Sequence, residues 1–319
     1  MKIFRGHAEV DQKFSCPIVT IGNFDGLHLG HRRIIEDVLK QARQKGGTSV
    51  VYTFRPHPHL ALAPDEDLQL INTYDEKIDL LREIGVDVVV EEPFSREFST
   101  NSPEFFFNDI LVGKLSANTI YVGYDFGFGK NRAGSLELLK KLCAGRGIEL
   151  VVTEPFKING ETCSSSRIRN YIKDGNVSAA SELLGRPFFY RGLVIRGQGR
   201  GHKIGFATAN VHTESKLRVK EGVYATFAVY GGKRYLSVTN VGRQPTFNKS
   251  DDAPVAVETH LFDFDQDIYG EVLEVQMVER IRDEVRFGGI DELVAQIRKD
   301  AEVAKKILAR QSGQKKDKH

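Results

Sequence analysis

The chain has no tryptophan, only two methionines and only three cysteines among its 319 residues. The cysteines, Cys16, Cys143 and Cys163, are odd in number and far apart. Disulfide frameworks and zinc sites use paired cysteines at short spacing, so neither is expected, and the three thiols suit a reducing compartment. The cysteine content therefore predicts a cytoplasmic protein.

Long apolar runs and a charge excess of one sign are also missing. The N-terminal segment "MKIFRGHAEVDQKF" lacks the apolar region of a signal peptide. The sequence also contains no run of about 18 apolar residues, the length needed to cross a membrane. The 45 basic and 43 acidic side chains nearly cancel, leaving a formal net charge of +2. Such a balance gives no reason to expect non-specific nucleic-acid binding. We expect neither a membrane nor a nucleic acid as a partner.

The sequence instead has two halves of different character. Residues 16–156 alternate β-branched runs with helix-like stretches, which is typical of a parallel sheet with helices on its faces. Residues 188–281 carry alternating strands joined by Gly, Asp and Asn turns, typical of an antiparallel barrel or sandwich, and residues 290–309 form an amphipathic helix. "GRP" at 185–187 is a plausible junction, because glycine ends a helix and proline cannot continue it. We expect two domains, 1–185 and 186–312, and a disordered tail at 313–319.

The segment "GNFDGLHLGH", residues 22–31, lies where the first predicted strand turns into a helix. Glycines let a backbone approach a ligand closely, and a helix N-terminus favours anions such as phosphates. His28 and His31 can donate hydrogen bonds to phosphate oxygens and to the charge that builds on a transferring phosphorus. The pattern favours nucleotidyl transfer. A zinc pair and a structural turn with incidental histidines stay open as alternatives on this segment alone.

A second segment, "CSSSRIR" at 163–169, opens a later predicted helix. Its serines can cap that helix and bind phosphates, and an arginine can meet the phosphates as a forked cation. "HLGH" and "CSSSRIR" are similar to the two signatures of the nucleotidylyltransferase superfamily, H-x-G-H and I-S-S-T-x-x-R, and occur in the same order. Together with "TFRPHP" (53–58) and "VGYDFGFGKNRAG" (122–134), they resemble the FMN adenylyltransferase module of the prokaryotic bifunctional riboflavin kinase/FAD synthetases.

This resemblance implies a Rossmann-like domain in which the FMN phosphate attacks the α-phosphorus of ATP and pyrophosphate leaves. His28 and His31 would then be catalytic, binding and stabilising the ATP phosphates. Asp125 would lie at the mouth of the site, near the adenosine or Mg²⁺. The other ATP-binding residues that the resemblance implies are Gly22, Asn23, Phe24, Asp25, Gly30, Ser164, Ser165, Arg167 and Arg169. Ser135 stands where the family more often has an acidic residue, which affects only a peripheral loop contact.

The second half has its own glycine-rich segment, "GQGRGHKIGFATAN" at 197–210. It is not a P-loop, because it lacks Gly-Lys-Ser/Thr, and by itself it could be a flexible hairpin tip. Yet "RGHKIGFATAN" resembles the riboflavin kinase signature G-R-x-L-G-x-P-T-A-N. The match continues through "GVYA", "NVGRQPTF", "VETHLFDFDQDIYG" and "RIRDEVRF" in family order, so the resemblance covers nearly the whole chain.

The resemblance implies a six-stranded barrel that transfers the γ-phosphate of ATP to the 5′-hydroxyl of riboflavin. A hydroxyl is a poor nucleophile, so a carboxylate helps to remove its proton, and Glu258 holds the family's base position. Thr208 and Asn210 would hold Mg²⁺, which keeps several waters and uses few protein ligands. The other ATP- or flavin-binding residues implied are Gly199, Gly201, Lys203, Gly205 and Arg282.

Two residues depart from the family pattern in the kinase half. Ala207 stands where the family usually has proline, and Gln244 where it usually has arginine. Proline would fix φ near −65°, so alanine leaves the turn before Thr208 freer. The alternatives are therefore a monofunctional FAD synthetase with a weakened kinase half and a flavin-binding regulator without turnover. The intact site residues favour a bifunctional enzyme that uses riboflavin, FMN, ATP and Mg²⁺, makes FAD, and is a monomer or transient homo-oligomer.

Overall fold

The computed structural model describes residues 1–63, 67–197, 206–213, 216–243 and 255–313. The chain divides into two compact units, Met1–Ser165 and Ser166–His319. This division comes earlier than the junction predicted at 185–187, because the two helices before that junction pack with the second unit. The predicted tail lies, from residue 314 on, outside the described residues.

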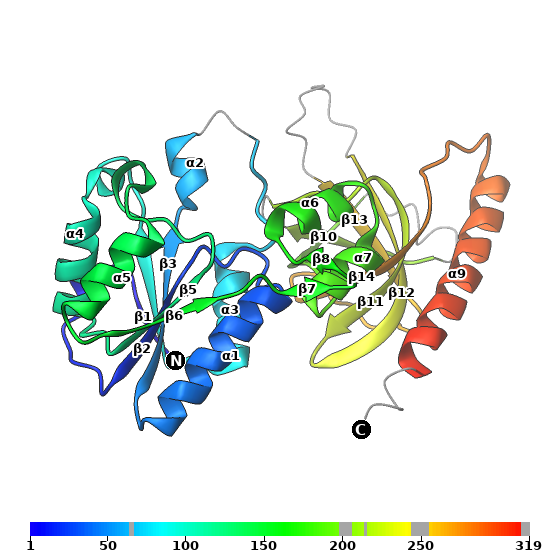
Figure 1. The fold of residues 1–319 in the computed structure, drawn as a ribbon. Coiled ribbons are helices and arrows are strands. Elements are labelled where there is room, and N and C mark those ends of the chain that lie inside the picture. Colours follow the sequence, from blue (N-terminus) through cyan, green and yellow to red (C-terminus); the bar gives the residue numbers. More distant parts are fainter. Residues whose placement is uncertain (64–66, 198–205, 214–215, 244–254, 314–319) are drawn as a thin grey trace. The chain divides into compact units, whose positions relative to one another are not determined.

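The first unit is built on a six-stranded sheet in the order β1-β4-β3-β2-β5-β6, and its strand pairs are all parallel (Figure 1). The strands are β1 (Lys2–Phe4), β2 (Pro17–Ile21), β3 (Thr48–Arg55), β4 (Val88–Pro93), β5 (Thr119–Gly123) and β6 (Glu149–Thr153). Every residue of β2 is buried, as expected for a β-branched strand that is covered on both faces. The predicted parallel-sheet domain is confirmed.

Helices cover both faces of this sheet. They are α1 (Leu29–Gln44), α3 (Tyr74–Ile84), α4 (Pro103–Phe105) with the π-helix η3 (Phe106–Lys114) that continues it, and α5 (Leu136–Ala144). α1 and α3 pack against Val51 and Val89, whereas η3 and α5 pack against Val50 and Val90. Since successive strand residues point to opposite faces, these are the two faces of one sheet. Shorter elements are η1 (His7–Glu9), α2 (Pro58–Leu62), η2 (Phe98–Thr100), η4 (Lys130–Arg132), β7 (Lys157–Ile158) and β8 (Glu161–Thr162).

The strand order places a topological switch point between β2 and β5. From β2 the chain moves to β3 and β4 on one side, and β5 and β6 lie on the other side. In open α/β sheets, ligands bind outside the carboxyl ends of the strands at such a point. The segments that leave β2 and β5 there are residues 22–28 and 124–135, and both contain motifs found in the sequence.

The second unit is a closed barrel with the strand order β10-β13-β12-β11-β14-β9, and its strand pairs are antiparallel. The strands are β9 (Phe188–Ile195), β10 (Ala209–Thr213), β11 (Gly222–Tyr230), β12 (Lys233–Arg243), β13 (Val255–Leu261) and β14 (Val272–Arg282). A two-residue turn of Gly231 (φ 56°) and Gly232 (φ 75°) joins β11 to β12, a conformation that glycine adopts without strain. The predicted antiparallel half is confirmed, and it is a barrel.

The inside of the barrel is lined by hydroxyls as well as apolar groups. Thr226, Ser237, Thr239 and Thr259 are fully buried and hydrogen-bonded in a row, with oxygen–oxygen distances of 2.7 to 3.0 Å. Each buried hydroxyl therefore has a partner, which removes the cost of burying it. Because strand residues alternate, the residues next to these in sequence lie on the outside of the barrel.

Three helices accompany the barrel in the part of the chain that the structure describes. α9 (Ile290–Gly313) lays Ala304 and Leu308 against Val223 and Phe227 of β11. This confirms the amphipathic helix predicted for residues 290–309. α6 (Ser165–Lys173) and α7 (Val177–Leu184) precede the barrel, and α7 packs on β9 and β14.

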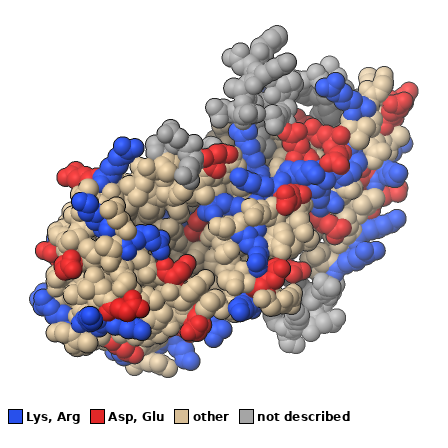
Figure 2. Space-filling view, turned by 45° about the horizontal axis from the view of Figure 1, so that its top comes forward, with Lys and Arg blue, Asp and Glu red and all other residues tan. Residues whose placement is uncertain are grey.

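The surface and the helices agree with the composition. On the face drawn in Figure 2, acidic and basic side chains are interspersed and neither sign dominates one region. Among the described residues, no helix combines the length and apolar character needed to cross a membrane.

Candidate active sites

The turn after β2 is compact and shaped by its glycines. Gly26 has φ 82°, and a Cβ there would lie 2.8 Å from Ile71 Cδ1, so only glycine fits without strain. A Cβ on Gly22 would meet the ring of Phe24 at 2.9 Å. Phe24 itself is buried in the cluster under α1 and α3. Its side chain therefore supports the turn from within the core, and a contact of Phe24 with ATP stays a prediction.

His28 and His31 form a stacked pair at the start of α1. His28 is the N-cap residue, and its Nδ1 accepts a hydrogen bond from the His31 backbone N–H at 3.3 Å. The ring centroids lie 3.6 Å apart with an interplanar angle of 19°. A Cβ on Gly30 would lie 3.2 Å from the His28 ring, so glycine makes room for this ring. The structure thus brings both predicted histidines together at the switch point.

The protonation of this pair follows from its contacts. Since Nδ1 of His28 accepts, the neutral ring carries its proton on Nε2. Burial, and then the neighbouring His28, hold the pKa of His31 well below its ordinary value. His31 Nδ1 is buried and has no hydrogen-bond partner within the described part of the chain. His31 is therefore a neutral imidazole at neutral pH.

Asp25 has a structural partner in the segment before α3. Its carboxylate is buried and accepts hydrogen bonds from the backbone N–H groups of Ile71 (3.0 Å) and Asn72 (3.4 Å). Thr53 Oγ1 donates to the carbonyl of Asn23 at 3.2 Å. Asp25 and Asn23 therefore tie the turn to neighbouring segments, and direct contacts of these two residues with ATP stay predictions.

Lys77 on α3 is a residue that the sequence analysis missed. Its Nζ donates to Thr53 Oγ1 at 3.0 Å and to the Phe54 carbonyl at 3.3 Å. Burial lowers the pKa of Lys77 to about 8, although the carboxylate of Asp25 acts in the opposite direction. The sequence signal was its position four residues before Leu81, which places both side chains on the buried face of α3. Lys77 thus supports the end of β3 next to the turn that follows β2.

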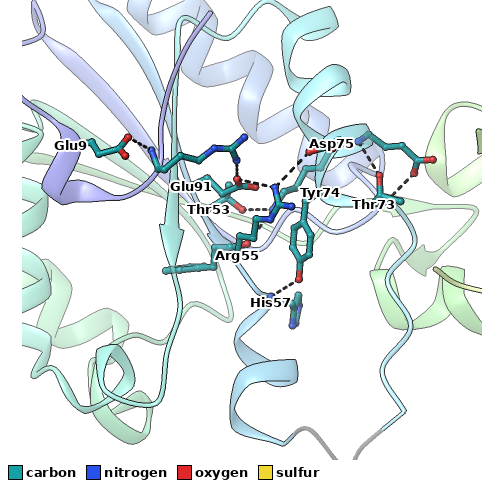
Figure 3. A network of polar contacts seen from close by, with 12 residues as sticks. Glu9, Thr53, Arg55, His57, Thr73, Tyr74, Asp75 and Glu91 are labelled. Carbon is teal, nitrogen blue, oxygen red and sulfur yellow. Dashed lines mark hydrogen bonds and ion pairs between the residues drawn. The ribbon is translucent and has the colours of Figure 1, made fainter. Parts of the chain in front are cut away.

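A network of charged and polar groups fixes the segment that follows β3 (Figure 3). Glu91 is buried and contacts Arg5 and, at 3.7 Å, Arg55. The His57 backbone N–H donates to the hydroxyl of Tyr74 at 2.9 Å. These contacts hold the "TFRPHP" motif in place next to a small pocket. The pocket is lined by Asn23, Asp25, Phe54, His57, Leu70, Asn72, Thr73, Tyr74 and Lys77.

The other predicted residues of the first site lie just after β5 and at the start of α6. Asp125 is exposed just after β5, the strand that pairs with β2, so it lies at the same sheet edge as the histidines. Ser165 Oγ donates to the Asp25 carbonyl at 2.9 Å, which joins the second signature to the first turn. Ser164 is half-buried one residue earlier. Arg167 and Arg169 follow on α6 in the second compact unit, and their contact with ATP stays a prediction.

The candidate kinase site lies on the outside of the barrel. Glu258 is exposed on β13 and stands opposite Asn210 of β10 and Asn240 of β12 in the strand register. Directly opposite residues of antiparallel strands point to the same face, with Cβ atoms about 5 Å apart. The buried neighbours Val257 and Thr259 point inward. The structure therefore brings Glu258 and Asn210 together and adds Asn240, which the sequence analysis missed.

The residues around Asn210, Glu258 and Asn240 are also closely packed. A Cβ on Gly197 would lie 2.3 Å from Asn210 Nδ2, so a larger residue there would displace the Asn210 side chain. Asn240 Nδ2 donates to Glu284 Oε1 at 2.9 Å. Thr208 is partly buried immediately before β10. The predicted residues Gly199, Gly201, Lys203 and Gly205, and the departure Gln244, lie outside the described residues.

Arg282 is engaged with α9. It donates from Nε to Asp300 Oδ1 at 3.0 Å and from the NH2 nitrogen to Asp300 Oδ2 at 2.7 Å. Its third nitrogen donates to the Asp283 carbonyl at 2.8 Å. Arg282 therefore fastens the C-terminal helix to the barrel, and its place at the border of a flavin site stays a prediction.

Comparison with known proteins assigns the family. A family model described as FAD synthetase matches residues 11–167, and one described as riboflavin kinase matches residues 184–308.

Curated proteins named bifunctional riboflavin kinase/FMN adenylyltransferase match almost the full length. The one from Bacillus subtilis (strain 168) is 35% identical over 300 residues, covering 93% of this chain and 94% of that protein. The one from Escherichia coli (strain K12) is 35% identical over 311 residues, covering 97% and 98%. A crystal structure from Streptococcus pneumoniae, described as a macrolide-efflux protein, has a TM-score of 0.86 at 32% identity and covers 95% of this chain and 98% of its own. The chain therefore belongs to the family of bifunctional riboflavin kinase/FMN adenylyltransferases.

Proposed function

We propose that this chain phosphorylates riboflavin to FMN on the barrel and adenylylates FMN to FAD on the parallel-sheet unit, with ATP as co-substrate of both reactions. Family membership over nearly the whole chain supports both activities. The observation that carries the proposal is a pair of chemically different polar sites. One is the stacked His28–His31 pair, and the other is the row of Asn210, Glu258 and Asn240.

At the first site, the FMN phosphate would attack the α-phosphorus of ATP. A new phosphorus–oxygen bond forms, the bond to the bridging oxygen breaks, and pyrophosphate leaves with the electron pair. Negative charge builds on the oxygens around the α-phosphorus, where donors at a helix start are favourable. His28 and the neutral His31, stacked at the start of α1, would act as hydrogen-bond donors to these oxygens. Both would bind the phosphates more strongly in the transition state than in the ground state.

At the second site, the 5′-hydroxyl of riboflavin would attack the γ-phosphorus of ATP. Glu258 would accept the hydroxyl proton while ADP leaves. Its position on the open outer face of β13 supports this role, because a substrate can reach the carboxylate there. Asn210, opposite Glu258, would orient the phosphate end of the nucleotide beside the base.

Mg²⁺ fits the donors of the second site. The Thr208 hydroxyl and the Asn210 amide carbonyl are oxygen ligands, which Mg²⁺ prefers. Within the described ranges there is no group of three or more His, Cys, Asp or Glu side chains that could hold a metal ion by itself. A Mg²⁺ ion that arrives with ATP and keeps several waters needs no such cluster. When bound, the ion would neutralise charge on the phosphates, while Thr208 and Asn210 hold it in place.

We also propose that the enzyme acts in the cytoplasm, as a monomer or transient homo-oligomer. Its three cysteines are free thiols, and burial raises the pKa of Cys143 to about 11, so this thiol is unreactive. Functionally, we place the domain boundary at residue 185, because the riboflavin kinase model begins at residue 184. With this boundary, α6 and α7 belong in sequence to the adenylyltransferase domain, although they group with the barrel in the compact units.

The test is a time course with purified protein, riboflavin, ATP and Mg²⁺, in which the flavins are separated by chromatography. FMN should appear first and FAD should follow. If riboflavin stays unchanged while supplied FMN becomes FAD, the chain is a monofunctional FAD synthetase. If flavin binds tightly and neither product forms, the chain is a regulator and the proposal fails.

A further inference from the structure

The turn that leads into β10 is held by a histidine from the neighbouring strand. His260 Nδ1 lies 2.7 Å from the carbonyl oxygen of Ala207. A carbonyl oxygen can only accept, so Nδ1 must carry the proton. The hydrogen bond thus selects one tautomer of the neutral ring and links β13 to the residue just before Thr208.

The ring of His260 is itself held in place by two aromatic side chains. Its centroid lies 5.4 Å from that of Phe206 and 5.6 Å from that of Phe262, with interplanar angles of 72° and 71°. Such edge-to-face contacts favour one ring orientation. Phe262 also belongs to the buried cluster under α9, so the ring is anchored to the core of the barrel.

The Ala207 carbonyl belongs to the same rigid peptide as the backbone nitrogen of Thr208. Because a peptide group is planar, holding its oxygen also sets the direction in which the Thr208 backbone leaves it. β10 then begins with Ala209, which pairs with Thr259, and Asn210 follows opposite Glu258. Glu258 and His260 are two residues apart on one strand and so share a face.

We propose that His260 is a positioning residue of the kinase reaction. By holding the Ala207–Thr208 peptide, it places the Thr208 hydroxyl for Mg²⁺ and phosphate and supplies the rigidity that a proline at position 207 would supply through its fixed φ. This inference rests on the proposed role of Thr208. Sequence spacing alone does not reveal it, because His260 and Ala207 are 53 positions apart.

Two substitutions in the full chain separate the hydrogen bond from the packing. H260F keeps a ring between Phe206 and Phe262 but removes the donor. H260N places an amide N–H at the δ position and can keep the bond. We expect H260F to lower kcat/KM for riboflavin phosphorylation by about 10- to 100-fold, chiefly through the KM for Mg-ATP. H260N should stay within about 3-fold of the parent, since it can still position the peptide.

The adenylylation of supplied FMN serves as the internal control for folding and should be unchanged in both variants. Equal losses in H260F and H260N, or a parental kinase rate and KM in H260F, would overturn the proposal. Should the parent chain itself fail to phosphorylate riboflavin, the proposed kinase function fails, which is a different result from an active parent with an unaffected H260F.

A second test restores the constraint by another route. A207P should be active as a single variant and should recover most of the lost kinase activity when added to H260F. An inactive A207P, or an active A207P that gives no recovery in H260F, would contradict the view that the hydrogen bond takes the place of proline.

Discussion

Replacing Asp300 by alanine should loosen the C-terminal helix from the barrel. Asp300 lies on α9 with 4% of its surface exposed, and its carboxylate accepts hydrogen bonds from two guanidinium nitrogens of Arg282. It also accepts a hydrogen bond from Gln296 Nε2 at 2.8 Å. Apart from this pair, α9 is held mainly by apolar contacts such as those of Ala304 and Leu308. The carboxylate is therefore the main polar attachment of the helix.

The magnitude follows from the exposure of the partner that remains. Removing one member of a buried ion pair costs about 3–5 kcal/mol. The Arg282 side chain is 21% exposed, so water can partly solvate its charge and the lower end, about 3 kcal/mol, applies. At about 1.4 kcal/mol per factor of ten, local opening of α9 should become roughly 100-fold more frequent.

Amide hydrogen exchange measured by mass spectrometry on the full chain reports this opening directly. Helices in proteins owe most of their stability to tertiary packing of their apolar face, so peptides from 290–313 should exchange roughly 100-fold faster in D300A. D300N keeps an acceptor oxygen and should show a smaller change, while peptides from β2 and β3 should not change. Unaltered protection of α9 in D300A, or an equal loss throughout both units, would refute the reasoning.

Three further predictions concern the sites. The pKa of Lys77 is lowered to about 8, so between pH 8 and 10.5 the unfolded chain binds its proton and the folded chain does not, and this group makes stability rise with pH. In ¹³C-lysine NMR of the full chain, one Cε resonance should titrate near pH 8 and vanish in K77M; titration of that resonance above pH 10 would disprove the depressed pKa. G197A should lower riboflavin phosphorylation about 10-fold or more by displacing Asn210, whereas G289A, where a Cβ meets open space, should leave both activities intact. The pKa of His31 is also lowered, so stability should fall as the pH drops below about 6.5, where the unfolded imidazole takes up a proton. H31Q should flatten this decline in melting temperature, and an unchanged decline would assign it to other groups.

Local sequence patterns predict those parts of the fold that depend on short-range rules. The fully buried strand β2 and the amphipathic helix α9 follow from apolar periodicity, and the Gly231–Gly232 hairpin follows from turn preferences. The segments 22–28 and 124–135 follow the neighbouring strands β2 and β5, as expected for the motifs of an open α/β sheet.

What the sequence does not predict depends on partners distant along the chain. The buried carboxylate of Asp25 serves backbone groups 46 residues away, and Arg282 meets a carboxylate 18 residues away. Asn240 joins Glu258 only through the register of β12 and β13. The pairing of α6 and α7 with the barrel is likewise a tertiary effect, which "GRP" as a local helix stop does not determine.

We propose that two separate sites in this chain catalyse the two transfers. The most direct measurement is a chromatographic time course of riboflavin, FMN and FAD with the parent chain, H31A and E258Q. The account predicts that H31A accumulates FMN, with adenylylation lowered by about 100-fold or more because a transition-state donor is lost. E258Q should phosphorylate riboflavin about 100-fold more slowly, because its general base is gone, yet convert supplied FMN to FAD at the parental rate. If either variant loses both activities to the same extent, or if E258Q keeps the parental kinase rate, the account is contradicted.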